Sequence, residues 1–522
     1  MRKLKAVFIL LLALFLTGCC VDENGNIVLG NNCEIAVTNA TFKCNGASCN
    51  GMSEYNGSGV NIWSYKNGGS NSVDLSVSMY TSKDITIVYT NEGNSYVAMP
   101  SISINTALRN EISPYEENLY NEYSDDVYRF IEPDFIRDFE PAELIEQSDD
   151  LKLNQAPSYK VWSEGNKYNW NVAYGSAIRA TTLRKQLTVN GRTINLWVED
   201  SEYANGGMGT TKINSVASYI GAIYTGVVSV AGEPWGTHGA SNLIPSGNQP
   251  LDIVFFNTGN SGIGGYFGSY NNYKKSVYSN SNEAVVIFIH TRMNVLPVIA
   301  HELTHAIDFY QRFVVMGEGN QFNAFLGEMR AVMMEDVIAS RISYNNVGYR
   351  YKGWLNTPLY QQDFSDWKYA DSSSYNVAGS LGAFLLRQYG IDFFKTLFKT
   401  RSDLSTNDYR AKEINILDKA IKVYDSRGLA KALRNWGASI AMFPTSATPK
   451  GFGYPARSND NGFNLEAFDD NSYRSYRKLP TSSPSTLAPH AHFPFLRKPT
   501  ASYTYEEQFR VPSGVSISIV VK

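Results

Sequence analysis

The sequence predicts an α+β protein with strands near both ends and helices through the middle. Apolar and polar residues alternate over residues 73–79 and again over 515–521, which is the pattern of half-buried strands. Between them, residues 212–230 place apolar side chains at the spacing of a helix face. The 522 residues are 43% hydrophobic and 18% charged, which is typical of folded chains with roughly two to four domains.

The first 18 residues resemble a secretory signal, with three basic residues before an apolar run over residues 6–15. The run is too short to cross a bilayer, and we expect no other membrane-spanning segment. It ends in Leu16-Thr17-Gly18-Cys19, which resembles a bacterial lipobox. The resemblance implies that Cys19 is lipidated and anchors the protein in the bacterial cell envelope, at the outer membrane or the cell surface. An ordinary secretory signal is the alternative.

The charge balance excludes partners that are bound by positive charge alone. The chain carries 46 basic and 49 acidic residues, and removal of residues 1–18 would leave 43 against 49, a net charge of −6. Because nucleic-acid binding needs a basic surface, we expect no nucleic-acid partner.

The other four cysteines, Cys20, Cys33, Cys44 and Cys49, all lie near the N-terminus. An exported protein can form disulfides, and four cysteines permit three pairings. A zinc site built from all four is the alternative, but their spacing lacks paired CxxC motifs. We therefore expect disulfides, with the pairing left open.

Composition divides the mature chain into four regions. Residues 19–110 alternate like a small β-sandwich module, and residues 446–522 return to alternation as a C-terminal β region. Residues 111–160 are expected to be an acidic linker, since 111–150 hold 14 acidic and 2 basic residues; an inhibitory pro-segment is the alternative. Residues 161–445 form the main domain. It is expected to contain a hairpin turn at Asn190-Gly191, short apolar strands and then helices to about residue 440.

The most informative motif is His301-Glu302-Leu303-Thr304-His305. Residues i and i+4 share one face of a helix, so both imidazoles can bind one zinc ion, and Glu302 can take a proton from the bound water. Residue frequencies give a chance match on the order of 0.3% in a chain with only 6 histidines. Two histidines on a solvated helix face are the alternative.

A catalytic zinc needs a third protein ligand, which we place on a helix expected at residues 324–342. Glu328 is the first choice. Glu335 lies on the same face and is either the second choice or an acceptor that orients a ligand. Asp308 is a candidate for orienting His305 or another ligand. The pair His490 and His492 forms a weak metal pattern that we expect at the surface.

With these residues the chain resembles the gluzincin metallopeptidases and, more narrowly, the hyicolysin-type zinc metallopeptidases. The resemblance spans roughly residues 187–389 and includes the segment Gly264–Gly268. It implies a zincin-like domain that binds Zn²⁺ through His301, His305 and Glu328. The family motif usually has an aromatic residue and Gln where this chain has Leu303-Thr304, which leaves the ligands unchanged.

Related zinc peptidases fit less well. Metzincins need Gly and His where this chain has Asp308 and Gln311, and thermolysin-like enzymes carry Asp where it has Val332.

The resemblance implies an endopeptidase that hydrolyses protein or peptide substrates, with Glu302 moving protons. Gluzincins often use a downstream tyrosine to stabilise the oxyanion, and Tyr375 is the candidate here. Two other functions stay open from the sequence. One is a non-catalytic surface lipoprotein, such as an adhesin, on a zincin scaffold; the other is a zinc hydrolase of non-peptide substrates.

Overall fold

The computed structural model describes much of the chain. The described residues are 19–21, 27–29, 37–57, 59–104, 142–145, 160–172, 177–204, 207–257, 259, 263–292, 294–345, 347–368, 372–442, 450–468, 473, 476–499 and 502–522. The expected signal peptide (1–18), Cys33 and most of the acidic segment 111–150 lie outside these residues. Cys19 and Cys20 fall in the short strand β1 (Cys19–Val21), which pairs with β2 (Ile27–Leu29).

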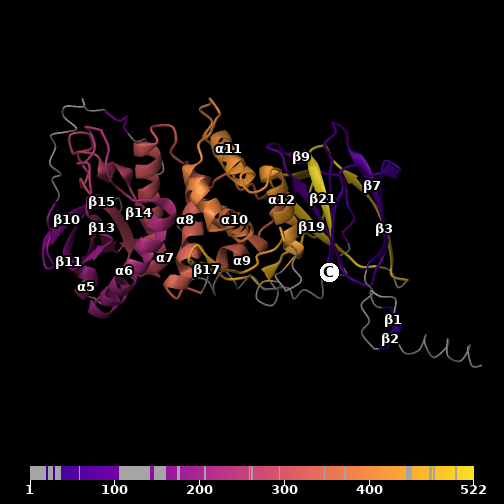
Figure 1. Cartoon of the computed structure of the whole chain (residues 1–522), viewed down its shortest axis with the longest axis horizontal. Helices are drawn as coiled ribbons and strands as arrows, with labels where there is room; N and C mark the ends of the chain where they lie inside the picture. The colour runs from indigo at the N-terminus through magenta and orange to yellow at the C-terminus, as the bar shows by residue number, and fades with distance from the viewer. Residues whose placement is uncertain are drawn as a thin grey trace, which may run out of the picture.

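The molecule is elongated, with a mixed sheet at one end, helices in the middle and a β-sandwich at the other end (Figure 1). The mix of helices and sheets agrees with the α+β prediction. The order along the long axis differs from the order along the sequence, because the sandwich contains both the first and the last strands of the chain.

The mixed sheet has the strand order β10-β11-β12-β13-β15-β14 within the described residues. Strands β12, β13 and β15 are parallel, and the short edge strand β14 runs antiparallel to β15. The expected hairpin turn joins β11 to β12, where Asn190 and Gly191 both adopt positive φ angles of 49° and 81°. The strand bounds are β10 Lys167–Val172, β11 Ala177–Val189, β12 Arg192–Glu199, β13 Leu251–Phe256, β14 Gly265–Phe267 and β15 Val285–His290.

Helix α6 (Thr210–Ala231) packs against the mixed sheet and the helices that follow it. Among the described residues it alone is long and apolar enough, by length and composition, to cross a membrane. Its apolar face, including Ile220, Ile223 and Val227, is buried in the core. Its hydrophobicity is therefore explained by packing, although no segment of this length and composition was expected after residue 18.

The middle of the molecule is helical. Helices α7 and α8 lie beside the sheet, and α10 packs on α8 and α9. The bounds are α5 Asp200–Ala204, α7 Val295–Asp308, α8 Ala324–Ile338, α9 Tyr349–Leu355, α10 Ser372–Lys399, α11 Tyr409–Lys422 and α12 Gly428–Ala438. A π-helical turn, η3 (Phe309–Val315), continues α7. The two-stranded ribbon β16 (Arg457–Asp460) and β17 (Phe463–Leu465) follows the helices.

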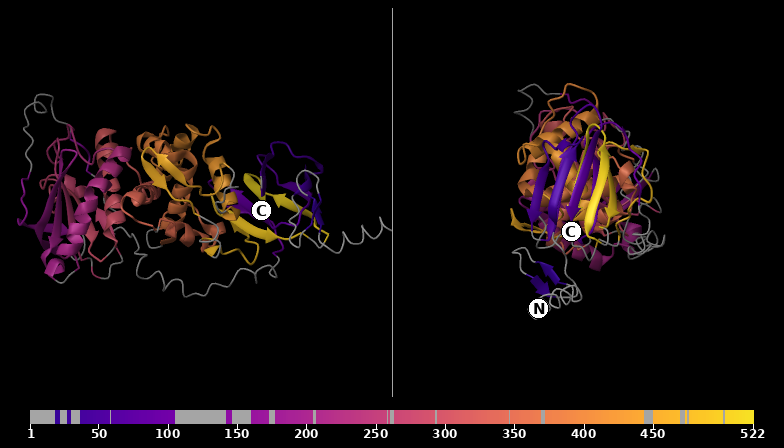
Figure 2. Two further views of the ribbon diagram at one scale, coloured as in Figure 1. Left: turned by 60° about the horizontal axis from the view of Figure 1, so that its bottom comes forward. Right: turned by 90° about the vertical axis from the view of Figure 1, so that its right-hand side faces the viewer.

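The β-sandwich is built from both ends of the chain, seen as indigo and yellow strands side by side in Figure 2. One sheet has the order β19-β8-β21-β6-β5 and the other β20-β7-β3-β4 within the described residues. We had expected two separate β regions at 19–110 and 446–522; instead they share one core. The bounds are β3 Thr38–Cys44, β4 Ala47–Ser48, β5 Ser53–Gly57, β6 Val60–Lys66, β7 Val73–Tyr80, β8 Ile85–Asn91, β9 Val97–Ala98, β18 Thr486–Leu487, β19 His492–Arg497, β20 Thr504–Val511 and β21 Val515–Val521.

The sandwich supplies two details that the sequence left open or placed wrongly. Cys44 and Cys49 form a disulfide, which agrees with the expectation that the N-terminal cysteines pair. His490 and His492 are both 1% exposed, so the expectation of a surface position was wrong. His490 bonds Asp363, whereas His492 bonds Thr90 of the neighbouring strand β8, so the two histidines do not share a partner.

Candidate metal centre

Helix α7 presents the two motif histidines on one face. Leu303, Ala306 and Ile307 are buried in the core on the rest of the helix, which anchors it against the sheet and α8. His301 and His305 lie one turn apart, with their ring centroids separated by 4.9 Å. His301 is 1% exposed, whereas His305 is only half-buried, so the site is reached from the side of His305.

Helix α8 brings Glu328 to the two histidines. Its carboxylate Oε2 lies 3.1 Å from Nε2 of His301, and its Oε1 lies 3.5 Å from Nε2 of His305. One ligand atom from each of the three residues lies within 4.8 Å of the others. The structure therefore brings together the three residues expected to bind the metal, although 22 residues separate His305 from Glu328 in the sequence.

The donor set fits a zinc ion. Two atoms that each bind a tetrahedral zinc at about 2.0–2.1 Å lie about 3.3–3.4 Å apart. The two measured separations, 3.1 and 3.5 Å, are close to this value. Two imidazole nitrogens and one carboxylate oxygen also leave one tetrahedral position for water or substrate, as in catalytic zinc sites.

Glu335 lies about two turns further along α8 than Glu328, on the same face of the helix, and contacts the other ring nitrogen of His301. Its Oε1 accepts a hydrogen bond of 2.8 Å from Nδ1 of His301, which leaves Nε2 of the ring facing Glu328. Burial is the largest effect on this imidazole and lowers its pKa. The hydrogen bonds to Glu328 and Glu335 outweigh burial and raise the pKa of His301 to about 10. Of the two roles left open for Glu335, the structure shows the contact expected of a residue that orients a ligand.

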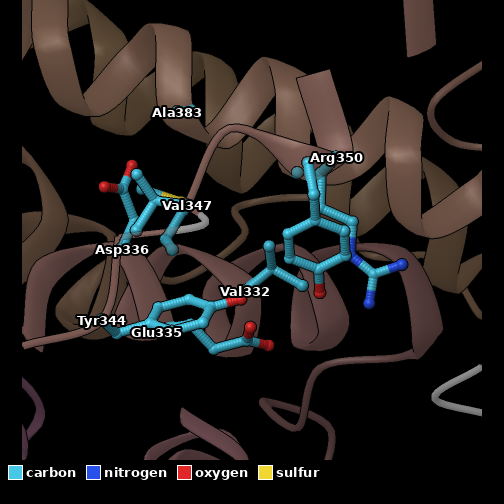
Figure 3. Close-up of a pocket in the computed structure, with 10 residues that line it drawn as sticks. Val332, Glu335, Asp336, Tyr344, Val347, Arg350 and Ala383 are labelled. Atoms are coloured by element: carbon cyan, nitrogen blue, oxygen red, sulfur yellow. The ribbon is translucent and has the colours of Figure 1, made fainter. Parts of the chain in front are cut away.

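Glu335 also lines a small cavity. Figure 3 shows Glu335 and Tyr344 lining it, with Arg350 on the opposite side. The neighbouring carboxylate, Asp336, also borders the cavity but forms a buried ion pair with Arg387. The two adjacent carboxylates of α8 therefore have different partners: one holds a histidine and the other holds α10.

Glu302 is buried beside the two histidines, at 3% exposure. Burial, followed by the partly opposing charges of the histidines and neighbouring carboxylates, raises the pKa of Glu302 to about 7. A carboxyl group with this pKa can both accept and release a proton near neutral pH.

Gly265 of the edge strand β14 packs directly on Glu302. A Cβ atom at this position would lie 2.7 Å from the carbonyl oxygen of Phe288, 2.9 Å from Val298 and 3.0 Å from Cγ of Glu302. Only glycine fits without displacing one of these groups. The role of Gly265 was missed from the sequence; the Gly264-Gly265 pair was the available signal for a close approach.

The structure pairs Asp308 with an arginine of the next helix. Its carboxylate forms two hydrogen bonds with the guanidinium of Arg330, at 2.9 and 2.6 Å, and no contact with His305 is found among the described residues. Arg330 is 0% exposed and stacks on Phe322 and Phe398. This buried pair ties α7 to α8 two residues from Glu328, so Asp308 aligns the helices and leaves the imidazole alone.

Tyr375, the expected oxyanion donor, begins the buried part of α10. Its ring packs edge-on against Trp367, with centroids 4.7 Å apart, and lies under the guanidinium of Arg350 at 5.0 Å. The contacts found for Tyr375 among the described residues place it beside Arg350 at the far side of the Glu335 cavity.

Two histidines and a glutamate around one point, with a second glutamate following the first histidine, are the residues of a zinc-dependent metallopeptidase centre. The chain belongs to the peptidase M30 family, the hyicolysin family, whose model matches residues 175–522. Residues 42–104 match a domain family of unknown function. No curated protein matches the chain.

Two solved structures show distant similarity. An aminopeptidase N family protein from Idiomarina loihiensis is 9% identical, with a TM-score of 0.29 over 65% of this chain and 71% of its own. An M1 zinc metallopeptidase from Deinococcus radiodurans is 10% identical, with a TM-score of 0.29 over 71% of this chain and 91% of its own. Because both TM-scores are below 0.5, these similarities carry no argument about mechanism.

Proposed function

We propose that this chain is a zinc-dependent endopeptidase, anchored in the bacterial cell envelope through Cys19, that cleaves protein or peptide substrates. The observation that carries the proposal is the convergence of His301, His305 and Glu328 beside the buried Glu302. Membership of a peptidase family supports the same reaction class.

The residues divide the chemistry among themselves. A zinc ion held by His301, His305 and Glu328 would supply Lewis-acid chemistry and lower the pKa of a water molecule. Glu302 takes the proton of the attacking water and then delivers it to the departing amine, for which its pKa of about 7 is suited. Glu335 holds the proton on Nδ1 of His301, so that Nε2 keeps its lone pair for the metal.

Endopeptidase cleavage is supported by the position of β14. This strand is the last in the sheet order and lies against Glu302 through Gly265. An extended substrate can add to a sheet edge through backbone hydrogen bonds on both sides of the bond to be cleaved. Such binding does not need a free terminus, which favours cleavage within a chain.

The test is the variant Glu302→Gln, compared with Glu506→Gln, which makes the same substitution at an exposed position of β20. We expect one zinc per chain in both, and loss of cleavage of a protein substrate by about 10²–10⁴-fold in Glu302→Gln alone. Undiminished cleavage by Glu302→Gln would contradict the assignment. Zinc binding without cleavage of any protein by the unmodified chain would favour the non-catalytic surface lipoprotein.

The anchor has its own test. Cys19→Ala should move the protein from the membrane fraction to the soluble fraction and abolish incorporation of labelled fatty acid. Incorporation that persists in this variant would contradict lipidation at Cys19.

A further inference from the structure

Residues 142–145 of the acidic linker lie extended on the surface of the main domain, residues 161–445, which we call the peptidase region. Their exposure alternates along the chain. Ala142 and Leu144 are half-buried and pack on the main core, whereas Glu143 and Ile145 point outward, with Ile145 59% exposed. A period of two is that of a β-strand with one face covered.

Among the residues that bind the backbone of this segment are Ser241, Asn242, Tyr273 and Glu318, which we call the peptide shelf. The hydroxyl of Tyr273 donates to the carbonyl of Ala142 at 2.8 Å, and the amide N–H of Leu144 donates to Glu318. The N–H of Ser241 donates to the carbonyl of Ile145 at 2.5 Å.

Asn242 makes the most informative contact of the peptide shelf. Its Nδ2 donates to the carbonyl of Glu143 at 2.7 Å, and its Oδ1 accepts from the N–H of Ile145 at 3.1 Å. One carboxamide thus bonds the residues before and after Leu144, as the peptide group of a neighbouring parallel strand would. Asn242 is 5% exposed and its own backbone carbonyl is bonded by Lys274, so its position is set by the fold.

The peptide shelf is continuous with the edge of the metal centre. The ring of Tyr273 lies 6.1 Å from that of Phe309, which follows α7, and Phe309 lies 6.1 Å from Phe267 of β14. Glu318 comes shortly after the π-helical turn that extends α7. The peptide shelf is therefore linked through these ring contacts to β14, which borders Glu302.

We propose that the peptide shelf is a binding site for extended peptides, which the linker residues Ala142–Ile145 occupy within the chain. The five hydrogen bonds described above all go to the peptide backbone, so they do not depend on the side chains of the occupant. The two inward positions select a small residue followed, two positions later, by an aliphatic one. The partner that binds in place of the linker is an extended segment of another polypeptide, with a small residue followed two positions later by an aliphatic one.

A linker that only needed attachment could use its side chains. Here the bound side chains are small or aliphatic, and the charged Glu143 points to solvent, which is how a strand-adding peptide is bound. Because the linker is part of the chain, it competes with an added peptide for the shelf at an effective concentration of roughly millimolar. Displacing it should therefore uncover the site.

The experiment uses full-length protein carrying Glu302→Gln, so that the probe is not cleaved. The probe is a fluorescein-labelled peptide of residues 139–148, and its binding is measured by anisotropy. Leu144→Asp in the protein puts a charge on the inward face and should release the linker. Ile145→Asp is the matched control, because it adds the same charge one residue on, at an outward position.

We expect Leu144→Asp to bind the probe at least tenfold more tightly than either Ile145→Asp or the parent protein. A second probe with Asp at the Leu144 position should bind at least tenfold more weakly than the first. Equal binding of the first probe to all three proteins, or equal binding of both probes, would overturn the proposal. Neither readout depends on catalysis, so the outcome is independent of the proposed function.

Discussion

Glu335 offers the sharpest test of how the metal centre is held together. It contacts His301 through a hydrogen bond of 2.8 Å, and the two residues are only 4% and 1% exposed. A hydrogen bond to a charged group contributes about 1.5–3 kcal/mol, and loss of such an outer contact typically lowers metal affinity by roughly 10–100-fold. Glu335→Gln keeps an oxygen acceptor and loses the charge, so we expect about a tenfold loss of zinc affinity. Glu335→Ala loses both, and about a hundredfold loss is expected.

The measurement is competition for zinc against a chromophoric chelator, with thermal unfolding recorded in parallel. Asp336→Asn is the matched control, because it removes the neighbouring carboxylate of α8, which binds Arg387. That variant should lose stability and keep its zinc affinity. If Glu335→Gln holds zinc as tightly as the unmodified protein, Glu335 does not position His301.

Three further predictions concern other parts of the molecule. Gly265→Ala should reduce cleavage at least tenfold through displacement of Glu302, whereas Gly221→Ala, with open space around the new Cβ, should not; equal activity would refute the packing argument. Burial raises the pKa of Asp252 from 3.8 to about 6, so its carboxyl opposes folding increasingly as the pH rises from 3.8 to 6. Across this gap of about 2 pH units, at about 1.36 kcal/mol per unit, the free energy of unfolding of Asp252→Asn should rise by about 3 kcal/mol relative to that of the unmodified protein. Urea unfolding measures this difference, and parallel curves of stability against pH would contradict it. Removal of the metal by a chelator should lower the free energy of unfolding by about 2.7 kcal/mol relative to protein in zinc at 100 times its Kd, and calorimetry showing no change on adding zinc back would argue against a metal site.

The local parts of the site could be predicted because helices are local structures. The spacing of apolar residues placed the motif on one helix and Glu328 on another, and both helices form as expected. The scarcity of histidine directed the search for a third ligand towards a carboxylate. The hairpin at Asn190-Gly191 was predicted for a similar reason, since its turn depends on adjacent residues.

The contacts that were missed depend on residues far apart in the sequence. Asp308 was expected to reach a histidine, but Arg330 on the next helix binds it with two hydrogen bonds, and no spacing rule reveals a buried partner on another element. His490 was expected at the surface because its surroundings are rich in proline and serine. It is buried because Asp363, 127 residues away, supplies its hydrogen-bond partner. The union of the two β regions was hidden for the same reason.

The way in which the sandwich closes determines what a cut in the chain would release, if Cys19 is anchored as proposed. Strand β8 is hydrogen-bonded on one side to β19 and on the other to β21, which lie some 400 residues later in the chain. A cut in the acidic linker would therefore not release the peptidase region, because strands β19 and β21 that follow it would remain hydrogen-bonded to β8, which precedes the linker. Separating the two parts would require a second cut beyond the helices or the unfolding of the whole sandwich, so an anchor at Cys19 would survive a single proteolytic event.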